Sequence, residues 1–549
     1  MKVSELLLRS LESYGVERAY GLVGTSILEL MDALKDSKIR YVSTRHEQVA
    51  VSMADADGRM TGLPGVAFVH GGGGFLNSLV SVCNAWKDGS PLLLVAGAVK
   101  KRMVGMDSWL EIPQSQMISS LVKKTWRVER GADAGRIFAE AFSMAVSPPK
   151  GPVFVEVPED VWPLEGGSQI VRLALTFPQE PREQEVSAVA KKIADSKRPL
   201  IVAGGGINSD EGSRALSSLL ARVEIPVVTT GNGRGAIPED HHLALGRIGF
   251  GGGSAVADAA LAEADLVLCL GGGISDVSTY GFNLTPKGEI IAVNLDPLWD
   301  RKPVHYESHF ESDAVTFTQR LAAICDRENI QTEWMNFIDR QQASWRALLK
   351  ESASHSKLGF VNPARFLLKL DEHLPDDTVI TAGQGVHLLY TYSSLKVRSS
   401  RGFLAATNMG SMGFVFPAAL GAKMAFPRRE VVGVMGDGEF LMTIQDLETA
   451  VREKISPKIV VVNDNSYRVL LMRQKIQKMG RVFGTTHANP DFVKLAESFG
   501  ADAMVVDSDD KIDSGIRFIT GKSEAPIIVE LKIDPEDLPP LNMRGSLMF

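Results

Sequence analysis

The chain has 549 residues, enough for about three or four domains of ordinary size, each with its own core. Apolar residues make up 44% and charged residues 23% of the chain, and 51 Gly with 26 Pro fall short of a disordered or collagenous composition. The net charge of −7 is spread without long blocks of one sign, which argues against nucleic acid or an anionic membrane surface as the main partner.

The three cysteines, Cys83, Cys269 and Cys325, form neither an even disulfide framework nor a CxxC pair, which indicates a reducing compartment. Residues 1–15 have the pattern of an amphipathic helix rather than of a signal peptide. No apolar run approaches the about 18–20 residues that span a bilayer. We therefore expect a cytoplasmic protein with no membrane partner.

Short β-branched runs that end in glycine or a carboxylate alternate with helical stretches along the chain, which is typical of parallel strands buried on both faces. The runs form three clusters. They lie at 41–47, 65–74, 91–98 and 152–160, then at 199–206, 226–235, 265–273 and 289–297, and then at 377–385, 431–439, 457–465 and 526–534.

Two connectors separate the clusters. Residues 163–185 are rich in Pro, Gly and charge, and a polar helical stretch spans about 329–359. The pattern predicts an α/β protein with three doubly wound parallel-sheet domains, at 1–165, 186–330 and 360–540.

Two glycine clusters of the second domain, 204–206 and 271–273, follow predicted strands but lack the third glycine of a GxGxxG motif. They indicate close turns between a strand and a helix. This absence argues against a dehydrogenase that binds NAD in the middle domain.

The sharpest signal lies at two strand ends of the third cluster, where chemistry is expected in an open parallel sheet. A GDG turn begins at Gly436, and Asp464 lies 27 residues after Asp437, at the end of the next predicted strand. Two strand ends that carry oxygen ligands can hold a hard cation, and Mg²⁺ prefers a few protein oxygens plus phosphate oxygens. The spacing therefore predicts a magnesium and diphosphate site.

Residues 436–465 resemble the GDG…NN motif of thiamine diphosphate (ThDP) enzymes. Residues 409–422 resemble the GTMGFxxPAAxGA stretch of the acetolactate synthase and benzoylformate decarboxylase group, and 233–241 resemble its counterpart in the middle domain. The resemblance implies a pyrimidine-binding, a central and a diphosphate-binding domain, with ThDP and Mg²⁺ as cofactors. The implied Mg²⁺ ligands are Asp437, Asp464 and the carbonyl of Ser466, and the other implied cofactor-binding residues are Gln384, Gly385, Gly410, Met412, Gly436, Gly438 and Glu439.

Some of these roles have alternatives. Met412 is implied to bend the cofactor into a V shape and the carbonyl of Gly410 to meet the pyrimidine amino group, although methionine also suits plain core filling. The family usually has TDxGxH or EGAN at the strand end 380–387, whereas this chain places Ala382 where an acid is common. His387 is equally well explained as a surface or packing histidine.

The first domain carries the implied catalytic residues. Glu47 opens a predicted helix, where an acid alone would indicate dipole compensation; the resemblance implies the buried glutamate that protonates N1′ of the aminopyrimidine. His70 precedes four glycines, and benzoylformate decarboxylase has histidine there and a serine matching Ser26, whereas most acetolactate synthases have threonine at His70. We interpret His70 and Ser26 as catalytic; a histidine locked in one tautomer within a glycine-rich loop is the alternative for His70.

Other positions depart from acetolactate synthases. Leu110 replaces a glutamine of their AFQE stretch, so residues that favour the condensation of two pyruvates are altered, although Lys123 falls where they too have lysine. Residues 273–276 lack the RFDDR-type stretch of FAD-carrying synthases, so flavin is not expected.

The sequence thus predicts a ThDP- and Mg²⁺-dependent C–C lyase or carboligase, foremost one that decarboxylates a 2-oxo acid. The alternatives are an acetolactate synthase, an enzyme of the benzaldehyde lyase or 2-hydroxyacyl-CoA lyase type acting on 2-hydroxy ketones, and a non-catalytic ThDP-binding paralogue. Loss of Glu47 or of the metal ligands would mark the paralogue, and neither is lost.

Two further expectations concern substrate and assembly. Arg468, Val469 and Arg473 lie where related enzymes border the reacting carbon, and arginine pairs with planar anions, so we expect an anionic substrate. The alternative is that both arginines point to solvent or pair with acids across a dimer. The resemblance implies a homodimer or homotetramer, because the pyrimidine and diphosphate sites come from different subunits in this family.

Overall fold

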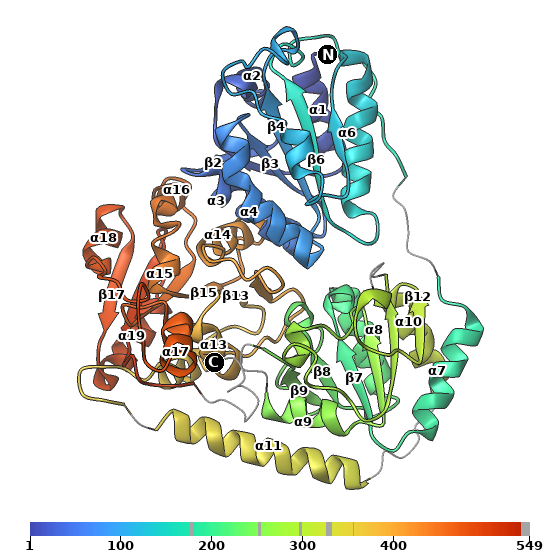
Figure 1. The fold of residues 1–549 in the computed structure, drawn as a ribbon, viewed down its shortest axis with the longest axis vertical. Helices are drawn as coiled ribbons and strands as arrows, with labels where there is room; N and C mark the ends of the chain where they lie inside the picture. The colour runs from blue at the N-terminus through green and yellow to red at the C-terminus, as the bar shows by residue number, and fades with distance from the viewer. Residues whose placement is uncertain (175–179, 251–253, 296–298, 326–331, 355, 540–549) are drawn as a thin grey trace.

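The computed structural model describes residues 1–539 apart from 175–179, 251–253, 296–298, 326–331 and 355. It consists of three α/β domains, each built on one six-stranded sheet of parallel strands (Figure 1). The predicted fold of three doubly wound parallel-sheet domains is confirmed. The domain bounds themselves stay a prediction, and parts of them (251–253, 296–298, 326–330 and 540) lie outside the described residues.

The first sheet has the strand order β2-β1-β3-β4-β6-β5. Helices α3 and α4 cover one face of this sheet, and α1, α2 and α6 cover the other, each through buried aliphatic side chains. The strands are β1 (Arg18–Gly21), β2 (Arg40–Ser43), β3 (Gly65–Val69), β4 (Leu92–Ala98), β5 (Thr125–Arg127) and β6 (Pro152–Pro158); the helices are α1 (Val3–Ser13), α2 (Leu28–Leu34), α3 (Glu47–Thr61), α4 (Gly73–Asp88), α5 (Gln114–Ile118) and α6 (Gly131–Val146).

The central sheet has the order β12-β11-β10-β7-β8-β9, with α7, α8 and α10 packed on one face and α9 and α11 on the other. Its strands are β7 (Pro199–Ala203), β8 (Val227–Thr229), β9 (Ala244–Arg247), β10 (Leu266–Leu270), β11 (Glu289–Asn294) and β12 (Ser308–Glu311); its helices are α7 (Glu183–Asp195), α8 (Asp210–Leu220), α9 (Ala255–Glu263), α10 (Ala314–Ile324) and α11 (Thr332–Ser352).

The polar helical connector predicted at about 329–359 forms α11, and it is more than a linker. Trp334 and Ile338 of α11 are buried in the core of the central domain, and the Trp334 indole donates a hydrogen bond of 3.2 Å to the carbonyl of Pro199. The helix therefore stabilises the domain that it follows.

The third sheet has the order β14-β13-β15-β16-β18-β17, which repeats the strand order of the first. Helices α14, α16 and α18 cover one face and α12, α13 and α19 the other. The strands are β13 (Val379–Ala382), β14 (Phe403–Ala405), β15 (Val431–Gly436), β16 (Lys458–Asn463), β17 (Asp502–Val506) and β18 (Ile527–Lys532); the helices are α12 (Pro363–Asp371), α13 (Val386–Ser394), α14 (Val415–Ala425), α15 (Asp437–Phe440), α16 (Leu447–Arg452), α17 (Arg468–Gln477), α18 (Phe492–Ser498) and α19 (Ile512–Ile519).

The first and third domains share one apolar core. Helix α3 packs along α14, as their proximity in Figure 1 shows, and Gly421 of α14 allows close approach because a Cβ there would lie 2.3 Å from the carbonyl oxygen of Met53. At the amino end of α3, the backbone N–H of Arg45 donates to the Asp446 carboxylate at 2.8 Å. These contacts hold the helix that begins at Glu47 against the third domain.

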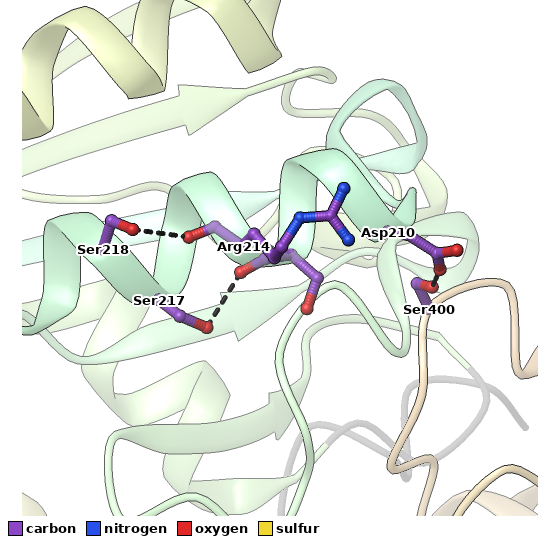
Figure 2. Close-up of a pocket in the computed structure, with 6 residues that line it drawn as sticks. Asp210, Arg214, Ser217, Ser218 and Ser400 are labelled. Carbon is purple, nitrogen blue, oxygen red and sulfur yellow. Dashed lines mark hydrogen bonds between the residues drawn. The ribbon is translucent and has the colours of Figure 1, made fainter.

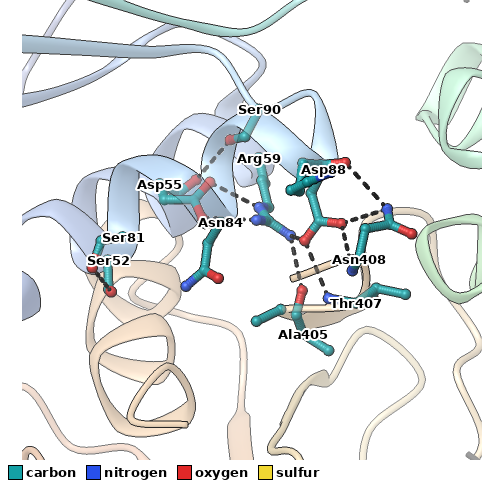
Figure 3. Close-up of polar contacts among 12 residues, drawn as sticks. Ser52, Asp55, Arg59, Ser81, Asn84, Asp88, Ser90, Ala405, Thr407 and Asn408 are labelled. Atoms are coloured by element: carbon teal, nitrogen blue, oxygen red, sulfur yellow. Dashed lines mark hydrogen bonds and ion pairs between the residues drawn. The ribbon is translucent and has the colours of Figure 1, made fainter. Parts of the chain in front are cut away.

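A buried carboxylate, Asp88 at the end of α4, joins all three domains, and Figure 3 shows its contacts within the first and third. It accepts hydrogen bonds from Arg59 at 3.1 Å, from Asn232 of the central domain at 3.1 Å, and from the backbone N–H groups of Thr407 and Asn408 at 3.2 Å each. The segment that leads into the predicted cofactor-binding stretch after residue 408 is thereby anchored to the first domain.

No helix within the described ranges is both long and apolar enough to cross a membrane.

Candidate active site

The predicted site residues of the third domain lie where the strand order of its sheet reverses. Strand β13 has β14 on one side and β15 on the other, so the chain builds the sheet outward in both directions from β13, and ligands bind in the crevice at the carboxyl ends of the strands at such a point. Gly383 follows β13 and Asp437 follows β15. In the first domain the same position lies between β1 and β3, and Ser26 and His70 come after these two strands.

Asp437 is buried and begins α15. Its Oδ2 accepts a hydrogen bond of 2.6 Å from Asn489 and lies 3.2 Å from Nε2 of His487. Sequence reasoning missed both partners, because they lie in an irregular loop after α17 with no regular spacing. Asn489 also donates to Asn463 at 2.9 Å, so one amide aligns the ends of β15 and β16.

Asp464 lies beside Asp437 at the end of β16. Its Oδ1 accepts hydrogen bonds from the backbone N–H of Ser466 at 3.0 Å and from its hydroxyl at 2.8 Å. Its Oδ2 lies 3.5 Å from Nη1 of Arg468. Burial raises the pKa of Asp464, Arg468 opposes that shift, and the negative charge of Asp437 adds to it. The structure thus places two predicted metal ligands side by side.

Glu439 and His387 face each other in the interior. Oε1 of Glu439 accepts from the backbone N–H groups of Gly413 at 3.0 Å and Phe414 at 3.3 Å, and its Oε2 lies 3.6 Å from Nε2 of His387. His387 is 7% exposed, so its interpretation as a surface histidine is wrong. The cofactor-binding role predicted for Glu439 stays a prediction.

The remaining predicted cofactor residues line the loops around these strand ends. Gln384 donates to the carbonyl of Ala406 at 3.2 Å. Gly410 has a φ of +70°, which favours glycine, and no atom lies within 4 Å of where its Cβ would be. Met412 is half-buried, and the neighbouring Ser411 donates to Asn84 of α4 at 2.7 Å. The stretch 410–412 therefore meets the first domain through α4.

Glu47 is buried at the first turn of α3. Its Oε2 accepts a hydrogen bond of 2.9 Å from Asn77 of α4. Gly74 of α4 lies so close that a Cβ there would be 2.9 Å from Oε1 of Glu47. The absence of a side chain at Gly74 therefore makes room for the carboxylate, which a role in dipole compensation alone would not require.

Ser26 and His70 form a hydrogen-bonded pair. The backbone N–H of Gly71 donates to Ser26 Oγ at 3.0 Å, Ser26 Oγ lies 2.7 Å from His70 Nδ1, and the backbone N–H of Ser26 lies 3.3 Å from the same nitrogen. Because an N–H group points at Nδ1, this network assigns Nδ1 as the acceptor and places the proton of the neutral ring on Nε2. Burial lowers the pKa of His70, with Glu47 opposing the shift, so the ring is neutral near pH 7.

A buried glutamine that sequence reasoning missed supports this loop. Gln114 accepts from the backbone N–H of Gly72 at 3.0 Å and donates to Glu156 at 2.9 Å and to the carbonyl of Gly97 at 3.0 Å. It thereby fixes the glycine-rich turn directly after His70. Nothing in the local pattern around Gln114 distinguishes it from a surface residue.

The predicted substrate residues lie on α17. Arg468 is 6% exposed, which contradicts the alternative that both arginines point to solvent, whereas Arg473 is exposed. Val469 packs against the core of the third domain. The role of the three in substrate binding stays a prediction.

A hollow of about 490 Å³ between α8 and the loop at Ser400 is shown in Figure 2. Its hydroxyl groups are already engaged, because Ser217 donates to the carbonyl of Ser213 at 2.8 Å and Ser218 to that of Arg214 at 2.9 Å. The hollow is lined by none of the predicted site residues. It is a surface groove between two domains rather than the candidate site.

The first glycine cluster of the central domain, 204–206, forms the predicted close turn, since α8 follows β7 after the 3₁₀ helix Gly205–Ile207. The strand-to-helix turn predicted at 271–273 is wrong, because the described residues between β10 and β11 contain no α-helix. Gly206 donates its N–H to the carbonyl of Gly271 at 2.7 Å, and a Cβ at Gly204 would lie 2.6 Å from that oxygen. The loops after β7 and β10 are therefore in backbone contact at the point where the strand order of this sheet reverses.

Comparison with known proteins places the chain in a family. Residues 1–119 match the N-terminal TPP binding domain of thiamine pyrophosphate enzymes, 186–321 their central domain, and 382–531 their C-terminal TPP binding domain. A probable acetolactate synthase large subunit of Methanocaldococcus jannaschii is 31% identical, covering 100% of this chain and 94% of that protein. An acetolactate synthase of Mycobacterium bovis is 30% identical over 96% and 87% of the two chains, and the acetolactate synthase isozyme 2 large subunit of Escherichia coli is 28% identical over 100% and 98%. Together with the paired sites at the strand ends, these matches show that the chain belongs to the thiamine diphosphate-dependent enzymes of the acetolactate synthase group.

Proposed function

We propose that this enzyme uses ThDP and Mg²⁺ to decarboxylate a 2-oxo acid, and that it releases an aldehyde or joins the remaining carbon to a second carbonyl. The Ser26–His70 pair carries the proposal. When bound, ThDP supplies a thiazolium carbon that adds to a carbonyl and takes up the electrons of the broken bond. The residues of the chain then supply orientation and protons.

Buried polar atoms without a hydrogen-bond partner support the cofactor assignment. Within the described residues, several of them gather at the strand ends of the third domain: Nε2 of His387, Oε2 of Glu439, all three guanidinium nitrogens of Arg468, and Nδ1 of His487. Buried polar atoms are nearly always paired, so such a cluster is completed by a polar ligand. Nitrogen donors beside two carboxylates fit a diphosphate held with a cation.

The metal assignment follows from the donor set. Among the described residues, no group of three or more His, Cys, Asp or Glu side chains is placed to hold a metal ion. Asp437 and Asp464, with the carbonyl of Ser466, leave ligand positions that phosphate oxygens would fill, and this incomplete set suits Mg²⁺ rather than a structural metal. We propose these three residues as its protein ligands.

The reaction type depends on where protons are available. The neutral His70 ring keeps its N–H at Nε2, and Ser26 holds the ring by Nδ1. A proton donor near the reacting carbon favours aldehyde release, because that carbon must gain a proton after CO₂ leaves. Glu47 would hold the proton at N1′ of the pyrimidine.

Acetolactate synthesis is the second candidate, and the names of the relatives favour it. It shares the decarboxylation step but needs a second 2-oxo acid as acceptor in place of a proton. Cleavage of 2-hydroxy ketones, as in benzaldehyde lyase or 2-hydroxyacyl-CoA lyase, would use the same proton transfers in reverse.

Product analysis distinguishes these reactions. The enzyme with ThDP and Mg²⁺ is incubated with single 2-oxo acids, pairs of them, and 2-hydroxy ketones, and CO₂, aldehyde and hydroxy-keto acid are measured. We expect equal amounts of CO₂ and aldehyde from a single 2-oxo acid, and a larger carboligated fraction from Ser26→Ala, which leaves His70 without its partner. A hydroxy-keto acid as the sole product would establish acetolactate synthesis instead, and no turnover on any substrate would indicate the non-catalytic paralogue.

We also propose that the active enzyme is a homodimer or a dimer of dimers. The known contacts of Glu47 stay within the first domain, whereas the metal ligands lie in the third. Helix α4, which carries Asn77, has three apolar residues that are partly exposed: Leu76 (42%), Val80 (43%) and Trp86 (38%). They form an apolar surface suited to contact with a second copy of the chain. We expect a light-scattering mass of at least two chains and a lighter species for Val80→Asp; a single-chain mass for the active holoenzyme would contradict the proposal.

A further inference from the structure

Arg468 is a buried cation that is only partly neutralised. It begins α17, and its side chain and that of Asp464 are each 5% exposed. Its Nη1 lies 3.5 Å from Oδ2 of Asp464, but none of its nitrogens makes a hydrogen bond within the described part of the chain. A guanidinium carries five N–H donors, and burying them unused is costly. The side chain is therefore positioned for an acceptor that the described residues do not provide.

The surroundings of Arg468 are acidic. Besides Asp464, Asp537 and Tyr390 lie near enough to the guanidinium for its charge to lower the pKa of all three, against the effect of burial. Asp437 lies close enough to Asp464 to disfavour its ionisation. Asp464 is therefore attracted to the charge of Arg468 and repelled by that of Asp437.

One oxygen of Asp464 is already committed. Its Oδ1 accepts both the backbone N–H and the hydroxyl of Ser466, so Oδ2 is the oxygen that faces Arg468. A divalent cation bound between Asp437 and Asp464 would draw on the same negative charge and would repel the guanidinium. The two cations therefore compete for one carboxylate.

We propose that Arg468 is the internal counter-ion of Asp464, which a divalent cation displaces, and that the released guanidinium then binds the anion held with the metal. The proposal rests on the proposed metal site at Asp437 and Asp464. It couples the two ligands, since metal binding frees the donor that an anion needs, and such coupling is reciprocal. It also makes the predicted role of Arg468 more specific: the residue binds a phosphate or carboxylate group of a ligand that binds after the metal.

The test uses Mn²⁺ alone and inorganic pyrophosphate, so that it does not depend on turnover. Mn²⁺ binding to the full-length protein is followed by electron paramagnetic resonance, and pyrophosphate binding at saturating Mn²⁺ by calorimetry. We expect Arg468→Met to tighten Mn²⁺ binding about tenfold, because the competing cation is gone, and to weaken pyrophosphate binding about tenfold. Arg481→Met is the matched control, with the same change at an exposed position in the loop just after α17, and should alter neither affinity by more than about twofold.

A merely structural role for Arg468 predicts a different result. If Arg468→Met weakens the binding of Mn²⁺ and of pyrophosphate together, or leaves both as in Arg481→Met, the proposal is wrong. If wild type itself binds no Mn²⁺ and Asp437→Ala changes nothing, the proposed metal site fails instead.

Asp464→Asn gives an independent measurement should Arg468→Met fail to fold. It removes the carboxylate and leaves the guanidinium free, so pyrophosphate binding without metal should tighten and its dependence on Mn²⁺ should weaken. An unchanged metal dependence would show that Asp464 neither binds the cation nor restrains Arg468.

Discussion

Replacing Glu47 by glutamine is expected to lower kcat by about 10²–10⁴-fold while ThDP still binds. The amide has the same size and its oxygen can still accept the hydrogen bond from Asn77, which Glu47 accepts at 2.9 Å. It cannot, however, exchange a proton with the nitrogen of the pyrimidine ring. Steady-state kinetics give kcat, and a ThDP titration followed by protein fluorescence gives the affinity.

The control for this prediction is Glu29→Gln, which also removes an acid from the first turn of a helix, α2. If Glu47 only compensates the helix dipole, the two variants should behave alike and lose well under 1 kcal/mol of stability each. Unchanged kcat in Glu47→Gln would remove this residue from the mechanism.

Asp437→Ala is expected to lose the cofactor rather than the proton transfer. Asp437 is the carboxylate that Asn489 and His487 orient, and the metal and the diphosphate bind as one unit. We expect Mn²⁺ affinity to fall by at least about 100-fold, with ThDP binding lost in parallel, because partners of metal ligands alone are worth about 10–100-fold. Calorimetry with ThDP in the presence and absence of Mg²⁺ measures this.

Asn489→Ala tests the same site from the residue that only the structure identified. It leaves both carboxylates in place but removes the 2.6 Å hydrogen bond to Asp437 and the 2.9 Å hydrogen bond to Asn463, so a loss of about 10-fold in Mn²⁺ affinity is expected.

Full cofactor affinity in Asp437→Ala would mean that the metal ligands lie elsewhere.

Most internal strands of the three sheets were predictable, and most edge strands were not. Each of the twelve predicted runs overlaps a strand, because central parallel strands are apolar on both faces, as in β10 with Leu266–Leu270. The missed strands are short or half-exposed. For example, β12 alternates Ser, His, Phe and Glu, and pairs with β11 alone. Only the neighbouring strand makes such a segment extended. The missed strands are β1, β5, β9, β12, β14 and β17.

The sequence by itself determined the part of the site that is formed by residues at the ends of predicted strands. Gly436 to Gly438 and Asp464 are predictable because each follows a buried strand directly, and parallel strands deliver their carboxyl ends to one edge of a sheet. Only the tertiary structure decided which distant side chains meet them. The 2.7 Å pairing of Ser26 with His70 and the support of Asp437 by Asn489 depend on how segments far apart in the chain pack together. Arg468 is only four residues from Asp464, but its burial depends on how α17 packs against the third domain. The physical reason is that no periodicity marks which polar side chains in loops and at helix starts will be buried together.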